Sequence, residues 1–128
     1  MYKEHKITLE DLATHTSGLP DYPSNFEASN ITSYQNYTRE QLYQGLSNTT
    51  LKTVPGTHFE YSDMGIAILG DILASKTGMP YEKLVENRIL NVLGMNSTMI
   101  NLSNPLVSQL ALGHVNGIEI PITSVNLV

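Results

Sequence analysis

The sequence predicts a mainly α-helical fold with long loops and one short strand or hairpin near the C-terminus. Three observations predict it: capping patterns that begin at Thr8 and Thr38, an almost continuous apolar run over residues 64–76, and apolar residues at helical spacing over 81–92. The chain has 128 residues, of which 41% are hydrophobic and 15% are charged. This length and composition suffice for one domain with a hydrophobic core.

Two short helices are expected in the first half of the chain. Thr8 is a favourable N-cap, and Asp11 follows three positions later, which is a capping-box pattern. The glycine and proline within residues 15–20 must end that helix early. The same pattern at Thr38 opens a second helix that runs to about Leu46. Segments rich in turn-forming residues predict irregular loops over 21–37 and 47–57.

A third helix is predicted from Met64 to about Lys76. Ser62 is a good N-cap, and Asp63 lies in the first turn, where a negative charge is favourable. The run is apolar on nearly every side, which is typical of a buried helix. Gly78 is expected just after its C-terminal end.

A fourth helix and a short strand complete the prediction. Pro80 suits the first turn of a helix, and Gly94 ends the run. The apolar residues expected to share one face of this helix are Tyr81, Leu84, Val85, Ile89 and Val92. Residues 118–120 alternate in polarity as a strand does, and Pro121 limits its length.

Composition excludes several classes of function. The formal net charge is −5, and the seven basic residues form no stripe, so we expect no nucleic-acid partner. Without cysteine there is no disulfide or thiolate metal site, and no two histidines stand at the spacing of a helical zinc motif. We therefore expect no metal and no cofactor. No apolar run is long enough to span a membrane, and the first residues do not read as a signal peptide.

Several blocks of this sequence resemble the family of class C β-lactamases, D-alanyl-D-alanine carboxypeptidases and related esterases. The first block is Ile-Thr-Leu-Glu-Asp-Leu-Ala-Thr-His-Thr-Ser-Gly-Leu-Pro at 7–20, and the second is Pro-Gly-Thr-His-Phe-Glu-Tyr-Ser-Asp-Met-Gly at 55–65, continuing to Gly70. Weaker matches follow in the expected order at residues 76–82, 89–95 and 111–114. The order of the blocks makes the resemblance strong over most of the chain.

The resemblance implies a serine acyl-transfer site with a catalytic tyrosine at Tyr61. In relatives this tyrosine relays a proton beside a Ser-x-x-Lys nucleophile, which requires nearby cations because a free phenol has a pKa near 10. The third residue of the element is usually Asn and here is Asp63, a substrate-binding position whose carboxylate can only accept hydrogen bonds. Ser62 and His15 are expected to have structural roles, as a helix cap and as a hydrogen-bonded turn residue.

The nucleophile itself is not found in these 128 residues, because no serine has a lysine three positions later. Lys76-Thr77-Gly78 matches another family motif by letters, but it lies in a helix-to-helix turn and not on a strand. The chain is therefore expected to be a single partial domain, 1–128: the helical lobe of a β-lactamase-like hydrolase, inactive alone and inclined to self-associate. The parent would act on a small or peptidoglycan-like acyl substrate, in the periplasm or outside the cell.

Three alternatives remain open at this stage. The Tyr-Ser-Asp element is also compatible with a plain helix start, in which a buried tyrosine precedes a capping serine. The chain could instead be a non-catalytic binding module of the same fold that uses the tyrosines of its loop region, Tyr22, Tyr34, Tyr37 and Tyr43. An unrelated enzyme built on His58 and Asp63 is the weakest alternative, because nothing in the sequence orients the two side chains.

Overall fold

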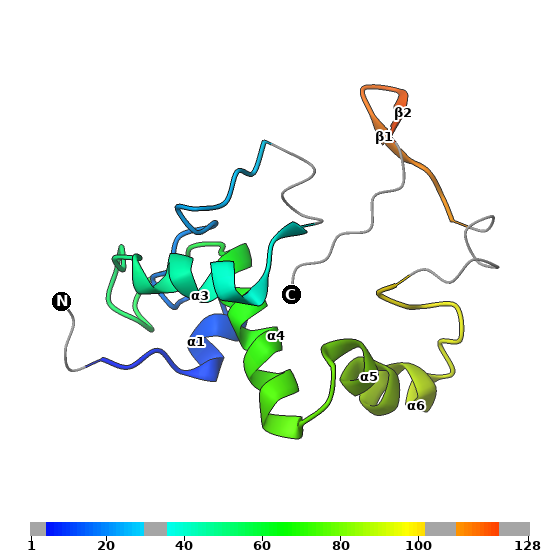
Figure 1. Ribbon diagram of the computed structural model, residues 1–128, viewed down its shortest axis with the longest axis horizontal. Coiled ribbons are helices and arrows are strands. Elements are labelled where there is room, and N and C mark those ends of the chain that lie inside the picture. The colour runs from blue at the N-terminus through cyan, green and yellow to red at the C-terminus, as the bar shows by residue number, and fades with distance from the viewer. Residues whose placement is uncertain (1–4, 30–35, 102–109, 121–128) are drawn as a thin grey trace.

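A computed structural model describes residues 5–29, 36–101 and 110–120 of the chain, and it is mainly α-helical, as predicted (Figure 1). The elements, in chain order, are α1 (Leu9–Ala13), α3 (Arg39–Ser47), α4 (Asp63–Thr77), α5 (Tyr81–Val85), a π-helical turn η1 (Glu86–Leu90), α6 (Asn91–Leu93), β1 (Gly113–Val115) and β2 (Ile118–Ile120). Helices α1, α3 and α4 lie together, and α5 leads away from the end of α4 (Figure 1).

The two predicted capping boxes are confirmed. At α1, the Thr8 hydroxyl accepts a hydrogen bond from the Asp11 amide at 3.1 Å, and the Asp11 carboxylate accepts one from the Thr8 amide at 2.8 Å. At α3, Thr38 and Gln41 make the same reciprocal pair at 3.3 and 2.8 Å. Each box supplies acceptors for amides that a helix start leaves unpaired, so both short helices begin where the local sequence predicts.

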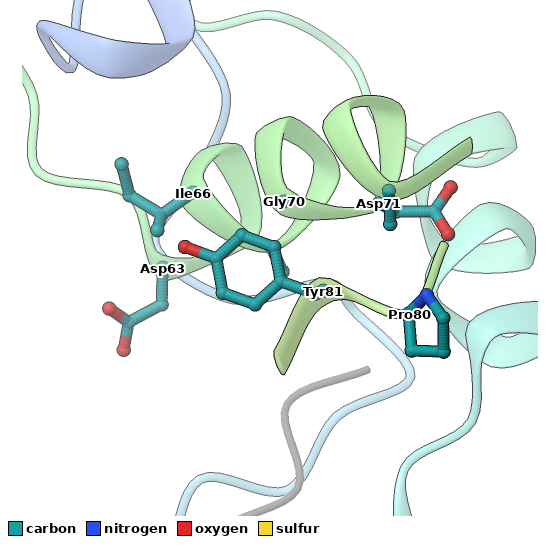
Figure 2. A pocket seen from close by; sticks show the side chains of 8 residues that line it. Asp63, Ile66, Gly70, Asp71, Pro80 and Tyr81 are labelled. Carbon is teal, nitrogen blue, oxygen red and sulfur yellow. The ribbon is translucent and has the colours of Figure 1, made fainter. Parts of the chain in front are cut away.

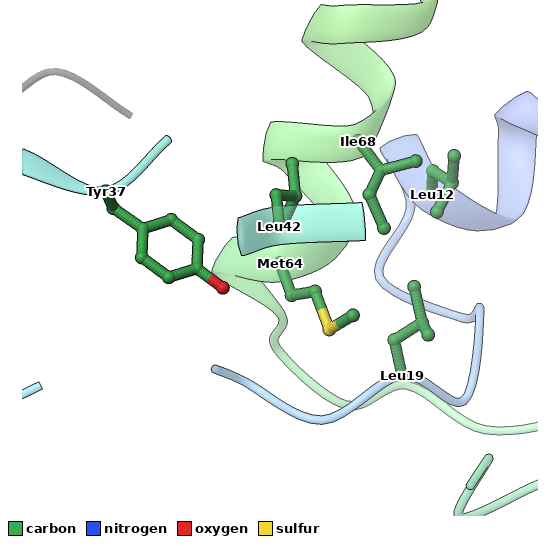
Figure 3. Close-up of a cluster of buried hydrophobic side chains, with 6 residues drawn as sticks. All are labelled: Leu12, Leu19, Tyr37, Leu42, Met64 and Ile68. Carbon is green, nitrogen blue, oxygen red and sulfur yellow. The ribbon is translucent and has the colours of Figure 1, made fainter. Parts of the chain in front are cut away.

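The hydrophobic core lies where α1, α3 and α4 meet the loop that follows α1 (Figure 3). Six side chains form it, and each is at most 9% exposed: Leu12, Leu19, Tyr37, Leu42, Met64 and Ile68. Tyr37 contributes its ring to this cluster, and its hydroxyl donates to Asn25 Oδ1 at 2.7 Å. The core therefore joins the first segment of the chain to the N-terminal half of α4.

An ion pair between the half-exposed Arg39 and the buried Asp71 joins α3 to the middle of α4. Arg39 donates from Nε to Asp71 Oδ1 at 2.5 Å and from Nη2 to Oδ2 at 3.0 Å, and the Tyr43 hydroxyl donates to Oδ2 at 2.5 Å. The hydrogen bond from Arg39 lowers the pKa of Asp71, and the bond to Asp71 raises the pKa of Tyr43. The stabilisation due to Asp71 is therefore present above its unfolded pKa and is lost as the pH falls through its lower folded pKa.

The expectation that α4 is buried on every side is wrong. Its buried positions are Met64, Gly65, Ile68 and Asp71, whereas Ile66 and Leu73 are 42% and 37% exposed. Helix apolarity alone does not tell which face a short chain can cover, and here α1 and α3 cover one side only. Among the described residues, no helix has the length and apolarity needed to cross a membrane.

The predicted apolar face of the fourth helix is also corrected. Ile89 and Val92 are 48% and 74% exposed, and the buried residue of this region is Leu90. The cause is the π-helical turn Glu86–Leu90, which inserts one residue into the helical repeat. An unbroken α-helix would bury position 89, and the inserted residue shifts the buried position to 90.

The predicted strand at 118–120 is confirmed as β2, which pairs antiparallel with β1 in a two-stranded hairpin. Its turn is Asn116-Gly117, and both residues have positive φ, 52° and 79°. Asn-Gly between two strands is a strong signal for a two-residue hairpin turn. That signal would have predicted β1 as well.

The loop tyrosines considered as a binding surface are used mainly for packing. Tyr37 is buried, Tyr43 is bonded to Asp71, and Tyr22 stacks on Phe26 with ring centroids 5.1 Å apart. Tyr34 lies outside the described residues. The described tyrosines therefore give no support to the binding-module alternative.

Gly45 provides a test of the packing between α3 and the preceding loop. Glycine inside a helix is ordinarily about 1 kcal/mol less favourable than alanine. A Cβ at Gly45, however, would lie 2.5 Å from Pro23 Cβ and 2.6 Å from Asn25 Oδ1. We expect Gly45→Ala to lower the free energy of unfolding by roughly 1–3 kcal/mol, measured by urea denaturation.

The matched control is Gly70→Ala in α4. A Cβ there would meet Tyr81 Cε2 at 3.6 Å, which is ordinary van der Waals contact. The free energy of unfolding should then stay constant or rise by up to about 1 kcal/mol. Equal effects of the two substitutions would contradict this account of the packing.

Candidate active site

The two sequence blocks that carry the family resemblance lie side by side. Four backbone hydrogen bonds of 2.8–2.9 Å join residues 15–21 to residues 52–64: Lys52 N to Gly18 O, Gly56 N to Thr16 O, Glu60 N to His15 O, and Met64 N to Asp21 O. The approach is so close that a Cβ on Gly18 would lie 2.5 Å from the Thr53 carbonyl oxygen, and Gly18 has a φ of +75°. Only glycine meets both conditions.

Ser62 joins these two blocks to the start of α4. Its hydroxyl donates to the Pro20 carbonyl at 2.6 Å and accepts from the Gly65 amide at 2.9 Å. Ser62 is therefore the N-cap of α4, and it is fully buried. One hydroxyl thus fixes both the start of the helix and its distance from the first segment.

His15 packs beside Ser62 in a left-handed backbone conformation, with φ 56°. Its Nδ1 accepts a hydrogen bond from the Ser62 amide at 3.1 Å. An amide can only donate, so Nδ1 carries no proton in this arrangement and the neutral ring is protonated at Nε2. His15 is thus hydrogen-bonded to the helix start.

Tyr61 extends from this junction and is 55% exposed. Its ring stacks on the His15 ring with centroids 4.6 Å apart, and its hydroxyl donates to Asp63 Oδ1 at 2.8 Å. The bond to Asp63, and then the negative charge of Asp63, raise the pKa of the Tyr61 phenol, with a smaller contribution from the charge of Asp21. The phenol is therefore held in its protonated form.

This direction of the pKa shift is opposite to what a proton-relay tyrosine needs. Both charged groups that act on Tyr61 within the described residues are carboxylates. A cation that lowers the phenol pKa would have to approach from another part of a larger site. The arrangement can orient a phenol and give it a hydrogen-bond acceptor, but it contains no activated nucleophile.

A pocket of about 380 Å³ adjoins this group between α4 and α5 (Figure 2). Asp63 lies at one end, and Tyr81 extends its ring back along α4 (Figure 2). The lining residues are Asp63, Ile66, Ala67, Gly70, Asp71, Ala74, Pro80 and Tyr81. This pocket is not predicted above, although three small residues of α4, spaced three and four apart, signal a face that a ring can approach.

The structure brings together all four residues singled out from the sequence. Ser62 and His15 are bonded to each other, and Tyr61 contacts both His15 and Asp63. The catalytic role of Tyr61 and the substrate-binding role of Asp63 stay predictions. The Lys76–Gly78 match lies at the C-terminal end of α4, where the Thr77 hydroxyl donates to the Leu73 carbonyl.

Tyr61 thus lies at the N-terminal end of a serine-capped helix and stacks on His15, the first residue of a His-Thr-Ser-Gly loop. The family model described as "Beta-lactamase" matches residues 2–121. The chain is also 41% identical over 98 residues to the D-alanyl-D-alanine-carboxypeptidase/endopeptidase AmpH of Escherichia coli strain K12, covering 76% of this chain and 25% of that protein. The chain thus spans about a quarter of the length of this curated relative.

Solved structures agree with this result. A β-lactamase/D-alanine carboxypeptidase from Yersinia pestis, solved with citrate, superposes with a TM-score of 0.75 at 28% identity, over 84% of this chain and 30% of that one. A similar protein from Pseudomonas syringae gives 0.75 at 25% identity, over 95% and 32%. The chain belongs to the β-lactamase family.

Replacing Asp63 by Asn tests the cause of the raised phenol pKa. Asp63→Asn removes both the charged acceptor and its field, so we expect the pKa of Tyr61 to fall toward its ordinary value near 10. The measurement is a pH titration of the tyrosine ¹³Cζ resonances by NMR, with the Tyr61 signal assigned by Tyr61→Phe.

Asp21→Asn is the graded control, because Asp21 acts on Tyr61 through charge alone. It should lower the phenol pKa less than Asp63→Asn does. Because folding raises this pKa, the stabilisation due to the Tyr61 proton is complete below the unfolded value and is lost as the pH rises through the folded value. If the pKa of the Tyr61 phenol does not move in Asp63→Asn, Asp63 is not the cause of its raised pKa.

Proposed function

We propose that this chain is the helical lobe, and part of the single domain, of a serine acyl-hydrolase related to β-lactamases and D-alanyl-D-alanine carboxypeptidases. The observation that carries the proposal is the position of Tyr61, at the N-terminal end of α4 and in contact with His15 and Asp63. The family membership and the names of the relatives support a substrate with a peptidoglycan-like acyl group. The 128 residues supply Tyr61 to a site that a larger protein completes.

The proposed chemistry is nucleophilic acyl transfer. A serine hydroxyl outside these residues attacks the substrate carbonyl, an acyl-enzyme forms, and water releases the acyl group. Tyr61 passes the proton between the serine and the leaving group, which requires its phenol to ionise more readily than it does here. A lysine ammonium beside it would oppose the effect of Asp63 and lower the pKa of the phenol.

Asp63 has a double role in this proposal. Its Oδ1 accepts the hydrogen bond from the Tyr61 hydroxyl, and Asp63 also lines the α4–α5 pocket. Its Oδ2 accepts no hydrogen bond from any residue that the structure describes, and it is available to a donor on the substrate. A carboxylate accepts only, so this position favours a substrate N–H over a substrate carbonyl.

The first test concerns the 128 residues alone. Without a nucleophile, the chain should give only background rates with nitrocefin and p-nitrophenyl esters, and no covalent label with a fluorescent penicillin. Stoichiometric labelling of the folded chain, absent when the chain is denatured before the penicillin is added, would overturn the proposal. It would require a nucleophile within these residues.

The second arm uses the longer gene product, if the reading frame that contains these residues carries an upstream Ser-x-x-Lys. There, Tyr61→Phe should lower kcat by about 10²–10⁴-fold, the range for loss of a general acid–base group. Tyr22→Phe is the matched control: it keeps the ring that stacks on Phe26, outside the α4–α5 pocket, and should leave kcat close to wild type. Equal losses in both variants would remove Tyr61 from the mechanism.

We also propose that the isolated 128 residues self-associate. Helix α4 exposes Ile66 and α6 exposes Val92 and Leu93, the last two at 74% and 66%. Burying such side chains between copies is favourable by about 25 cal/mol per Å². Light scattering should give a mass that rises with concentration, and Val92→Glu with Leu93→Glu should reduce it, whereas Asn91→Glu on the same exposed helix should not. A constant monomer mass at high concentration would count against self-association.

A further inference from the structure

His15 contacts the chain on both sides of Tyr61. Its carbonyl oxygen accepts a hydrogen bond from the Glu60 amide at 2.8 Å, and its ring Nδ1 accepts one from the Ser62 amide at 3.1 Å. Glu60 and Ser62 are the residues that flank Tyr61. One histidine, 46 positions earlier than Tyr61 in the chain, therefore fixes the backbone before and after the tyrosine.

The same histidine contacts the Tyr61 side chain. The two rings stack with centroids 4.6 Å apart and an interplanar angle of 28°. Phe59 meets the His15 ring from another direction, edge to face, at 5.8 Å and 77°. The imidazole thus contacts two aromatic rings within residues 55–65, and it is stacked only on that of Tyr61.

We propose that His15 is the positioning residue of Tyr61: its two hydrogen bonds fix the backbone around the tyrosine, and its ring selects the side-chain rotamer that brings the phenol to Asp63. The proposal deepens the proposed function, because a position for the phenol matters to catalysis only if Tyr61 acts there. The stacking itself is a property of the folded chain. His15 needs no contact with substrate for this role.

Histidine suits all the constraints at this position. A φ of 56° disfavours most side chains, and Asn and His are among those that tolerate it best. An Asn oxygen could accept the hydrogen bond from Ser62, but Asn has no ring to stack on Tyr61. A Phe ring could stack, but it has no acceptor for the Ser62 amide. The two functions can therefore be separated by substitution.

The experiment compares His15→Asn and His15→Phe in the 128-residue chain by NMR with selectively labelled tyrosine. In His15→Asn, the Ser62 amide should keep its protection from hydrogen exchange, while the ratio of stacked to unstacked Tyr61 χ1 rotamers should fall by up to about tenfold, the factor that corresponds to one aromatic pair. In His15→Phe, the rotamer ratio should be retained and the Ser62 amide should exchange faster. Phe59→Leu is the control and should leave the Tyr61 rotamers unchanged.

Two results would overturn the proposal. The first is an unchanged Tyr61 rotamer ratio in His15→Asn, and the second is the absence of ring-to-ring NOEs between His15 and Tyr61 in the wild-type chain. The second measurement needs no variant, so it holds even if a substitution prevents folding. The readout is the conformation of Tyr61 and not the activity. The positioning role of His15 can therefore fail while Tyr61→Phe still lowers kcat, and it can hold while Tyr61→Phe has no effect. The two proposals are thus tested separately.

Discussion

The buried hydroxyl of Ser62 is the contact on which the rest of this structure depends. It donates to the Pro20 carbonyl at 2.6 Å and accepts from the Gly65 amide, in the first turn of α4, at 2.9 Å. If that hydroxyl were lost, a buried carbonyl and a helix amide would both be unpaired, at a cost of about 1–3 kcal/mol for each group. The start of α4, the loop that contains His15 and the backbone of Tyr61 meet at Ser62. One capping interaction therefore helps to fix the position of all three.

The ion pair between Arg39 and Asp71 fixes α4 at a second point. The cap at Ser62 sets where the helix begins, and the pair sets how its middle lies against α3. Because Arg39 is half exposed, the pair itself is worth little in free energy, although removing Arg39 would leave the buried Asp71 carboxylate with the Tyr43 hydroxyl as its remaining donor among the described residues. The pair therefore matters less as a source of stability than as a constraint on the rotation of α4, and that rotation decides which residues face the pocket.

Local signals predicted most of the helices, and non-local contacts explain the failures. Thr8 and Thr38 specify their helix starts within four residues, so the sequence alone is sufficient there. The exposed side of α4 depends on what α1 and α3 can cover, and the burial of Leu90 depends on a π-turn that no spacing rule contains. At the site, the sequence alone identified Tyr61 and Asp63 as candidate residues. The stacking of His15 on Tyr61 joins positions 46 apart in the chain, so it could be found only in the folded structure.

The electrostatics of Tyr61 divide the proposed site into two parts with different tasks. This chain orients the phenol with the stacked His15 ring and the Asp63 carboxylate, and Asp63 stabilises both its orientation and its proton. A phenol that relays a proton needs the same orientation but a lower pKa. In the proposed function, residues of this chain supply the geometry, and a cation from another part of the site would supply the activation. The Asp63 carboxylate that orients the phenol also keeps it protonated, so on this proposal Tyr61 acts only when such a cation lies beside it.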